Sequence, residues 1–250
     1  MQTKYRSSPL INASKLKEFL DQDPRIAHHK LANPTPPSPA MALGTAVHAI
    51  IEHLGELPDD LVEFPFDSLR TKESKEWMKA NSDKTVLKSA EIQQAKAMAQ
   101  NVIDTDHCEM REIIHHPESQ REVAFYDDQF KALLDIVSPS GKIGVDYKTT
   151  AATSAEAFMR SAISYGYALQ AYHYKMMSKC SEFYFVAVSS VAPYPVWVIE
   201  CSPSFLAFGE SQWNKAMTAM SSEAPHSYEM DAPKWWTETP SSGEDLSTFY

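Results

Sequence analysis

The first half of the chain places its hydrophobic residues at helical spacing. Between Met41 and Leu54, apolar residues recur three and four positions apart, which predicts a helix with one buried face. The residues on that face are Leu43, Val47, Ile50, Ile51 and Leu54. A shorter helix is predicted from Asn12, its candidate N-cap, to Leu20, and the four prolines within residues 33–39 predict a loop after it. The stretch from Lys72 to Asp104 is rich in Ala, Lys, Gln, Glu and Met, and it predicts one or two exposed helices.

The second half begins with short apolar segments that are typical of strands. Three strands are predicted at Arg121–Tyr126, Phe130–Ser138 and Ile143–Thr149, and the sequence Ser-Pro-Ser-Gly at residues 138–141 predicts a hairpin turn between the last two. Helices and strands then alternate. The predicted elements are helices at 154–164 and 165–179, strands at 182–189 and 196–201, and a final helix at 203–220.

The end of the chain differs from the rest in charge. Residues 222–250 hold six acidic residues against the single lysine Lys234, with Trp235 and Trp236 among them. We expect one domain over residues 1–221, followed by an acidic tail over 222–250. That tail is either disordered or docked through its tryptophan pair.

Composition narrows the functional classes. The 250 residues carry a net charge of -10, which argues against a protein that passively coats nucleic acid but leaves a metal-dependent enzyme open. No apolar run approaches the roughly 18 residues of a membrane span, and the N-terminus leads into no signal core, so a cytoplasmic protein is expected. The three cysteines are scattered, which is typical of small buried residues rather than a disulfide framework or a metal cluster.

The predicted hairpin gathers three charged groups. Asp146 and Lys148 are two apart on one strand and share a face, and folding back at the turn brings Asp135 opposite Asp146 or one pair away. Two carboxylates side by side need positive charge between them, and oxygen ligands suit Mg²⁺ or Mn²⁺. A salt bridge on a solvated sheet face is the alternative.

Five stretches in this order resemble a known family. They are Ile11–Lys17 with its serine, Leu43-Gly44-Thr45-Ala46-Val47-His48, Glu122 before the hairpin, Asp146-Tyr147-Lys148-Thr149-Thr150 after Asp135, and the helix beginning Tyr165-Gly166-Tyr167-Ala168-Leu169-Gln170. Together they look like the PD-(D/E)xK nucleases, in particular the RecE-type, exonuclease VIII-like enzymes of phages and prophages. The chain is more distantly similar to lambda exonuclease. Where the family often has Arg-Pro before the first aspartate, this chain has Leu133 and Leu134.

The resemblance implies a fold and roles for the residues. The fold would be α/β, a restriction-endonuclease-like core with a central mixed sheet flanked by helices. Asp135, Asp146, the backbone carbonyl of Tyr147 and His48 would hold one or two Mg²⁺ or Mn²⁺ ions, and Lys148 would orient or deprotonate the attacking water. Glu122 would be a further ligand or would orient Gln170, which would bond the water or a phosphate. Ser14, Lys17 and Tyr167 would contact the DNA and its 5′-phosphate.

The activity that the resemblance implies is an exodeoxyribonuclease. It would digest linear double-stranded DNA from its ends, 5′ to 3′, and leave 3′ single strands for an annealing protein in recombination. Relatives form rings, so a trimer or tetramer in the cytoplasm of a bacterial host is expected. The alternatives are a non-catalytic DNA-end or protein-binding module, or a nuclease of the same core acting in repair or restriction. The chain has no phosphate-binding Gly-x-x-x-x-Gly-Lys-Ser/Thr loop of its own, so it would not be a helicase motor.

Overall fold

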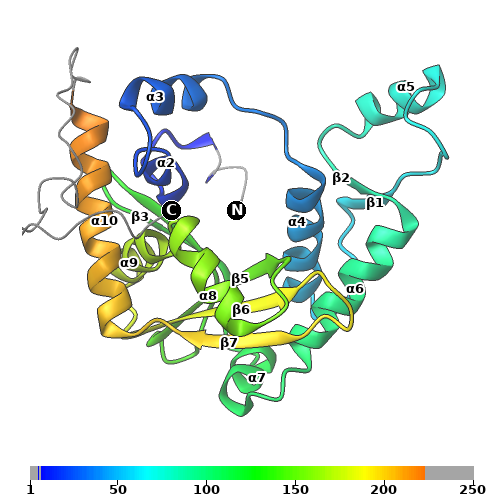
Figure 1. Cartoon of the computed structure of the whole chain (residues 1–250). Coiled ribbons are helices and arrows are strands. Elements are labelled where there is room, and N and C mark those ends of the chain that lie inside the picture. The colour runs from blue at the N-terminus through cyan, green and yellow to red at the C-terminus, as the bar shows by residue number, and fades with distance from the viewer. Residues whose placement is uncertain (1–4, 6, 223–250) are drawn as a thin grey trace, which may run out of the picture.

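A mixed β-sheet lies at the centre of the computed structural model, which describes Tyr5 and residues 7–222 (Figure 1). In this part of the chain five strands form the sheet in the order β3-β4-β5-β6-β7. Their bounds are β3 Gln120–Tyr126, β4 Lys131–Val137, β5 Ile143–Thr150, β6 Glu182–Ser189 and β7 Val196–Glu200. Only β5 and β6 run parallel; the other neighbours are antiparallel. The predicted central mixed sheet is confirmed.

The β4–β5 hairpin closes through the predicted turn. The Ser138 N–H donates to the Ile143 carbonyl at 2.9 Å, and the Gly141 N–H donates to the Ser138 carbonyl at 2.8 Å. Gly141 has φ of +70°, a conformation that glycine adopts without steric cost. The turn therefore fixes the register that brings the two aspartates level.

Three helices cover one face of the sheet. α8 (Ala155–Ser164) and α9 (Tyr167–Ser178) make the crossover that the parallel β5–β6 pair requires, and α10 (Pro203–Ser221) packs on α9. The contact is close at Gly209, where an added Cβ would lie 2.0 Å from the carbonyl oxygen of Ala168. The short N-terminal helix α2 (Ala13–Lys17) joins this layer by packing on α9.

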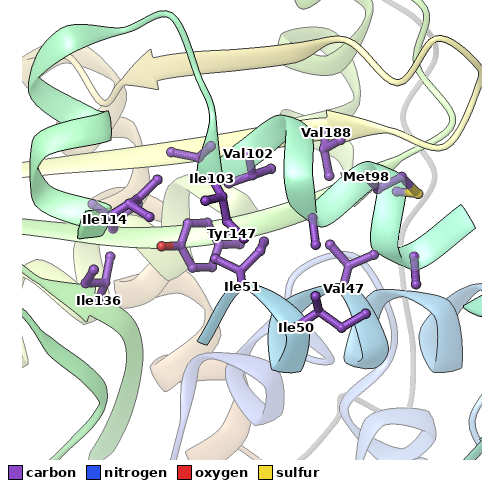
Figure 2. Close-up of a cluster of buried hydrophobic side chains, with 14 of the residues drawn as sticks. Val47, Ile50, Ile51, Met98, Val102, Ile103, Ile114, Ile136, Tyr147 and Val188 are labelled. Carbon is purple, nitrogen blue, oxygen red and sulfur yellow. The ribbon is translucent and has the colours of Figure 1, made fainter. Parts of the chain in front are cut away.

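The other face of the sheet is covered by α4 (Pro39–Glu52), α6 (Ser89–Ile103) and α7 (Cys108–His115). Val47, Ile50 and Ile51 of α4 share this core with Met98, Val102 and Ile103 of α6. Figure 2 shows the Tyr147 ring beside Ile51 and Ile103. The buried face predicted for the α4 sequence is thus confirmed at Val47, Ile50 and Ile51. Leu54 is a correction: the helix ends at Glu52, and Leu54 is 45% exposed with φ of 51°.

The region predicted as exposed helices, residues 72–104, is only partly so. α5 (Lys72–Ala80) is largely exposed, but α6 buries one whole face, including Ala95, Met98 and Ala99. The abundance of Ala, Lys, Gln, Glu and Met predicts a surface helix, whereas the spacing of the Ala and Met residues at three and four positions places them in the core. Between the two helices β2 (Thr85–Leu87) pairs in parallel with β1 (Leu61–Glu63), a two-stranded sheet that was not predicted.

The N-terminal prediction is confirmed at its start and wrong at its end. The Asn12 side chain accepts a hydrogen bond from the Lys15 N–H at 2.9 Å, but α2 stops at Lys17 rather than Leu20. α3 (Pro24–Ala32) follows, capped by Asp23. All three cysteines are free; Cys180 and Cys201 are buried as predicted, and Cys108 is exposed, which corrects the prediction for that residue.

The end of α10 at Ser221 matches the last residue of the predicted domain. The predicted acidic tail, with Trp235 and Trp236, lies outside the described residues apart from Ser222, so this division of the chain stays a prediction. Among the residues that the structure describes, no helix is long and apolar enough to cross a membrane.

Candidate active site

The pairing of β4 with β5 stops at the predicted carboxylates. The two strands are paired as far as Ile136 and Val145, and the next position in this register places Asp135 opposite Asp146. There the Oδ2 atom of Asp135 accepts a hydrogen bond from the Tyr147 N–H at 2.6 Å. The Asp135 side chain thus replaces a backbone hydrogen bond at the point where the regular pairing of β4 and β5 ends. Functional groups can therefore lie between the two strands there.

The neighbouring strand β3 is distorted at the same level. Its register with β4 skips Glu122 and Asp135, which stand level with each other between two regular pairs. Glu122 has φ of 48°, a conformation that costs about 1–2 kcal/mol for a residue with a side chain. Strain of this kind is often found at functional sites. Acidic residues from three adjacent strands, Glu122, Asp135 and Asp146, therefore lie across the sheet at one level.

Asp146 and Lys148 share the face that α9 covers. The Lys148 ammonium contacts the Oδ2 atom of Asp146, and the Gln170 amide donates to the Oδ1 atom at 3.0 Å. The Lys148 Nζ also lies 4.8 Å from the ring centroid of Tyr167 and 5.5 Å from that of Phe185. Both members of the charge pair are nearly buried, with side chains 14% and 6% exposed, so this is no salt bridge on a solvated sheet face.

A second lysine reaches the same place from α2. The Lys17 Nζ donates to the Gln170 Oε1 at 3.4 Å and lies 5.3 Å from the Tyr167 ring centroid. Burial and the nearby Lys148 charge lower the pKa of Lys17 to about 8. The approach depends on Gly166, which has φ of +64° and where a Cβ would lie 3.0 Å from the Lys17 side chain. The structure therefore brings Lys17, Tyr167 and Gln170 together with the predicted catalytic pair.

The helix α4 supplies the predicted histidine from the opposite face of the sheet. The Nδ1 atom of His48 lies 3.1 Å from the Oδ1 atom of Asp135, and its ring packs edge-on against Tyr147. Gly44 lets the helix come close to β5, because a Cβ there would lie 2.9 Å from the Thr149 hydroxyl.

Most of the sequence matches one known protein family. Residues 12–226 match the family described as a PDDEXK-like domain of unknown function, DUF3799. The chain belongs to this family. No sequence among curated proteins matches it.

Two crystal structures are similar to this PDDEXK-like domain. A candidate exonuclease from Eubacterium rectale has a TM-score of 0.58 and 14% identity, over 92% of this chain and 92% of that chain. A phage-related exonuclease from Haemophilus somnus has a TM-score of 0.38 and 10% identity, over 87% of this chain and 96% of that chain. The first shares the fold, which agrees with the predicted α/β core flanked by helices.

A further acidic residue of the PDDEXK-like domain was missed in the sequence. Glu52 follows His48 by four positions on α4, so the two side chains lie on the same helical surface. Burial and the charge and hydrogen bond of Glu122 raise the pKa of Glu52, and Asp135 contributes. The signal in the sequence was the spacing His48-x-x-x-Glu52 at the polar edge of an otherwise buried helix face.

The site has a charge asymmetry between its two aspartates. Burial favours the neutral form of Asp135, but the charge and hydrogen bond of His48 outweigh it and hold the pKa of Asp135 below its usual value. The charge of Asp135 in turn outweighs burial and raises the pKa of His48. Burial and Asp135 raise the pKa of Asp146 in spite of Lys148. Negative charge at Asp146 is therefore under-compensated.

The donors present fit a hard divalent cation. Such ions take carboxylate and carbonyl oxygens, and Asp135, Asp146, Glu52 and Glu122 provide carboxylates. His48 adds an imidazole, which is a common metal ligand. The Oδ2 atom of Asp146 is buried and, within the described residues, accepts no well-aligned hydrogen bond, so a lone pair remains for an ion. Across those residues no three acidic, histidine or cysteine side chains are yet close enough to hold one ion together, and His48 and Lys148 occupy the aspartates directly.

The contacts suggested for Glu122 and Ser14 are not seen among the contacts described above. The Gln170 amide bonds Asp146 and Lys17. Both roles suggested for Glu122, as a metal ligand or in orienting Gln170, stay predictions. Ser14 lies one turn before Lys17 on α2 but is exposed at the surface. Its contact with a 5′-phosphate also stays a prediction.

Proposed function

We propose that this PDDEXK-like domain is a metal-dependent exodeoxyribonuclease that digests linear double-stranded DNA from its ends, 5′ to 3′. The observation that carries the proposal is the buried Asp146–Lys148 pair, held by Gln170 and placed opposite Asp135 where two strands separate. A purely structural sheet has no need for this arrangement, because burying such charges costs several kcal/mol. The E. rectale protein of the same fold is named as a candidate exonuclease, which supports the same class of reaction.

The ligands of the proposed ion would come from both sides of the strand separation. Asp135, Asp146 and the Tyr147 carbonyl would hold one or two Mg²⁺ or Mn²⁺ ions, with His48, Glu52 and Glu122 as further donors. A divalent cation there supplies a lowered pKa for the attacking water and charge neutralisation on the phosphate.

Lys148 and its neighbours would act on the water and the phosphate. Burial disfavours the ammonium, but the charge of Asp146 outweighs it and raises the pKa of Lys148. A lysine that stays charged supports orientation of the water and neutralisation of the transition state rather than proton abstraction. Gln170 would hold the water or the scissile phosphate, and Lys17, Ser14 and Tyr167 would bind the 5′-phosphate end.

The wider role follows from the same resemblance. The 3′ single strands would serve a single-strand annealing protein in recombination within a bacterial host cell. A trimeric or tetrameric ring would keep the DNA enclosed. A ring also suits a chain whose net charge is -10, because each protomer of a ring needs to contribute only a few local cations to the DNA.

The test is the digestion of linear duplex DNA labelled at one 5′ or one 3′ end, with Mg²⁺ and then with EDTA. A covalently closed circle is the substrate control. Asp146→Asn and Lys148→Ala should be inactive, whereas Asp83→Asn, on the exposed turn before β2, should be as active as the wild type.

Release of 5′ label that needs the metal, together with an uncut circle, supports the proposal and gives the polarity. Cutting of the circle would leave a nuclease of the same core but remove the role in recombination. Binding of DNA ends without any cutting would favour a non-catalytic module.

A further inference from the structure

An aromatic side chain stands at the surface beside the proposed catalytic groups. Tyr165 is the C-cap of α8 and is 62% exposed. Its ring lies 5.8 Å from that of Tyr167 at an interplanar angle of 36°. Tyr167 in turn packs on Phe185 at 5.5 Å. A row of three rings thus leads from solvent into the core beside the proposed site.

The ammonium groups of two lysines lie near the inner rings of this row. The Nζ atoms of Lys148 and Lys17 lie 4.8 and 5.3 Å from the ring centroid of Tyr167. Positive charge is therefore concentrated at the second ring of the row, one ring-to-ring step from the exposed Tyr165. Aromatic faces beside a cationic track are how proteins bind single strands, with bases on the rings and phosphates on the cations.

A cavity opens at the same place. It has a volume of about 230 Å³, and its lining includes two lysines, two acidic residues and the end of α8, namely Lys17, Lys30, Glu18, Asp21, Ser164, Tyr165 and Gly166. Lys30 is already engaged by Glu18 and Gln22, at 3.4 and 2.8 Å, so Lys17 is the lysine of this lining that also reaches the Asp146 cluster. The αL conformation of Gly166 joins the exposed ring to α9, which fixes Tyr165 relative to Tyr167.

We propose that Tyr165 is a stacking platform for an unpaired base of the strand that is cut. The base would lie on the exposed ring, and its phosphate would lie toward Lys17 and Lys148. The inference rests on the proposed nuclease function and narrows its substrate to an end with at least one base out of the duplex. A base inside a duplex is stacked on both sides and offers no free face to a tyrosine. Lone exposed rings are common, but this ring continues a row that ends at the proposed site.

The binding test uses the full chain in EDTA, so that no cleavage occurs. The probes are 5′-phosphorylated duplexes with a short unpaired 5′ end that carries the fluorescent base 2-aminopurine, either in the unpaired segment or deep in the duplex. Binding should quench only the unpaired probe. Tyr165→Ala should abolish the quenching and weaken binding by about 5- to 150-fold, the range for one base–aromatic stack. Tyr165→Phe should retain both.

The matched control is Tyr126→Ala, since Tyr126 is 42% exposed on β3 and its ring packs on Tyr5. That variant should bind and quench as the wild type does. Equal quenching by Tyr165→Ala and the wild type, or loss of quenching in Tyr165→Phe, would overturn the inference. The same probes with Mg²⁺ report cleavage separately. If the wild type quenches the probe but does not cut it, the proposed nuclease function is refuted and the stacking role of Tyr165 stands. If the wild type cuts the probe and Tyr165→Ala cuts it equally well, the nuclease function stands and the stacking role is refuted.

Discussion

The two faces of the central sheet are built from different residues. Among the described residues, the face under α4, α6 and α7 is an aliphatic core, and its fully buried large side chains include Ile50, Met98 and Ile136. The face under α2, α8, α9 and α10 contains fully buried aromatic residues instead, namely Phe19, Phe158, Phe183 and Phe185. The aromatic face ends in the row of rings that lies beside the two lysines, Lys17 and Lys148.

The two faces also supply different chemistry to the strand separation between them. α4 brings an imidazole and a carboxylate, His48 and Glu52, to the side of Asp135. α2 and α9 bring an ammonium and an amide, Lys17 and Gln170, to the side of Asp146. We infer that the aliphatic face adds ion donors to Asp135 and Asp146, and that the aromatic face supplies the groups that bind the strand. Since the helices lie on opposite sides of one sheet, each contribution can be removed while the other stays in place.

The largest effect is expected from a change in the helix packing of the aromatic face. Gly209→Ala places a Cβ 2.0 Å from the Ala168 carbonyl oxygen, so α10 must move away from α9. Overpacking typically costs 1–3 kcal/mol, and a backbone clash belongs at the top of that range, so we expect a loss of about 3 kcal/mol. For a domain of this size the Tm should fall by roughly 6–12 °C, measured by thermal unfolding.

The control for this change is Ser211→Ala, which is exposed on the same helix and should leave the Tm within about 2 °C of the wild type, as surface substitutions usually do. An unchanged Tm in Gly209→Ala would contradict the close contact of the two helices.

The hairpin and the placement of its three charged residues could be predicted because their signals are local. Strand alternation places Asp146 and Lys148 on one face, and the turn at Ser138 fixes their distance from Asp135, so no distant contact is needed. The cap at Asn12 is likewise a matter of a few neighbouring residues. These predictions, and the order of strands and helices after residue 120, are confirmed by the structure.

The rest depended on tertiary contacts that the pattern does not carry. Glu52 is a polar residue at the edge of a buried face, and only the packing of α4 against the sheet brings it to Glu122. The burial of α6 was hidden by its small residues, and the strands at 61–63 and 85–87 are too short to show a period. The end of α4 before Leu54 also follows from packing rather than from hydrophobic spacing.

The next largest effect is a loss of Mn²⁺ affinity from a substitution on the aliphatic face. Glu52→Gln keeps the shape of the side chain but removes the charge that the proposed ion would meet. We expect Mn²⁺ affinity, measured by calorimetry, to fall by about 10- to 100-fold, the usual loss when a group supporting a metal site is removed. Binding of a 5′-phosphorylated strand in EDTA should not change.

Glu56→Gln is the matched control, because Glu56 lies four residues further along, beyond the end of α4, and is exposed. Its Mn²⁺ affinity should equal that of the wild type. If Glu52→Gln binds Mn²⁺ as tightly as the wild type, Glu52 is no ligand and the division between the two faces is weaker than inferred.

On the aromatic face, a smaller loss is expected, and it should affect strand binding rather than Mn²⁺ affinity. Lys17→Met retains the apolar stem of the side chain and removes the ammonium near Gln170. Binding of a 5′-phosphorylated strand should weaken by about 10-fold, the worth of one hydrogen bond to a charged group. The Mn²⁺ affinity should be unchanged. Lys72→Met, on exposed α5, should alter neither quantity; a loss of Mn²⁺ binding in Lys17→Met would mean that the two faces are not independent.

The smallest effect is a pH dependence of the same lysine. Burial and Lys148 lower the pKa of Lys17 from 10.5 to about 8, so the ammonium is lost as the pH rises through about 8. Folding penalises this charge, so the contribution of Lys17 to stability improves between pH 8 and 10.5, while its contribution to phosphate binding declines. The preference for a 5′-phosphate over a 5′-hydroxyl strand should therefore fall less than about 10-fold between pH 7.5 and 9. Lys17→Arg stays charged throughout and should keep the preference constant. A preference that declines equally in the arginine variant would place the titrating group elsewhere than on the aromatic face.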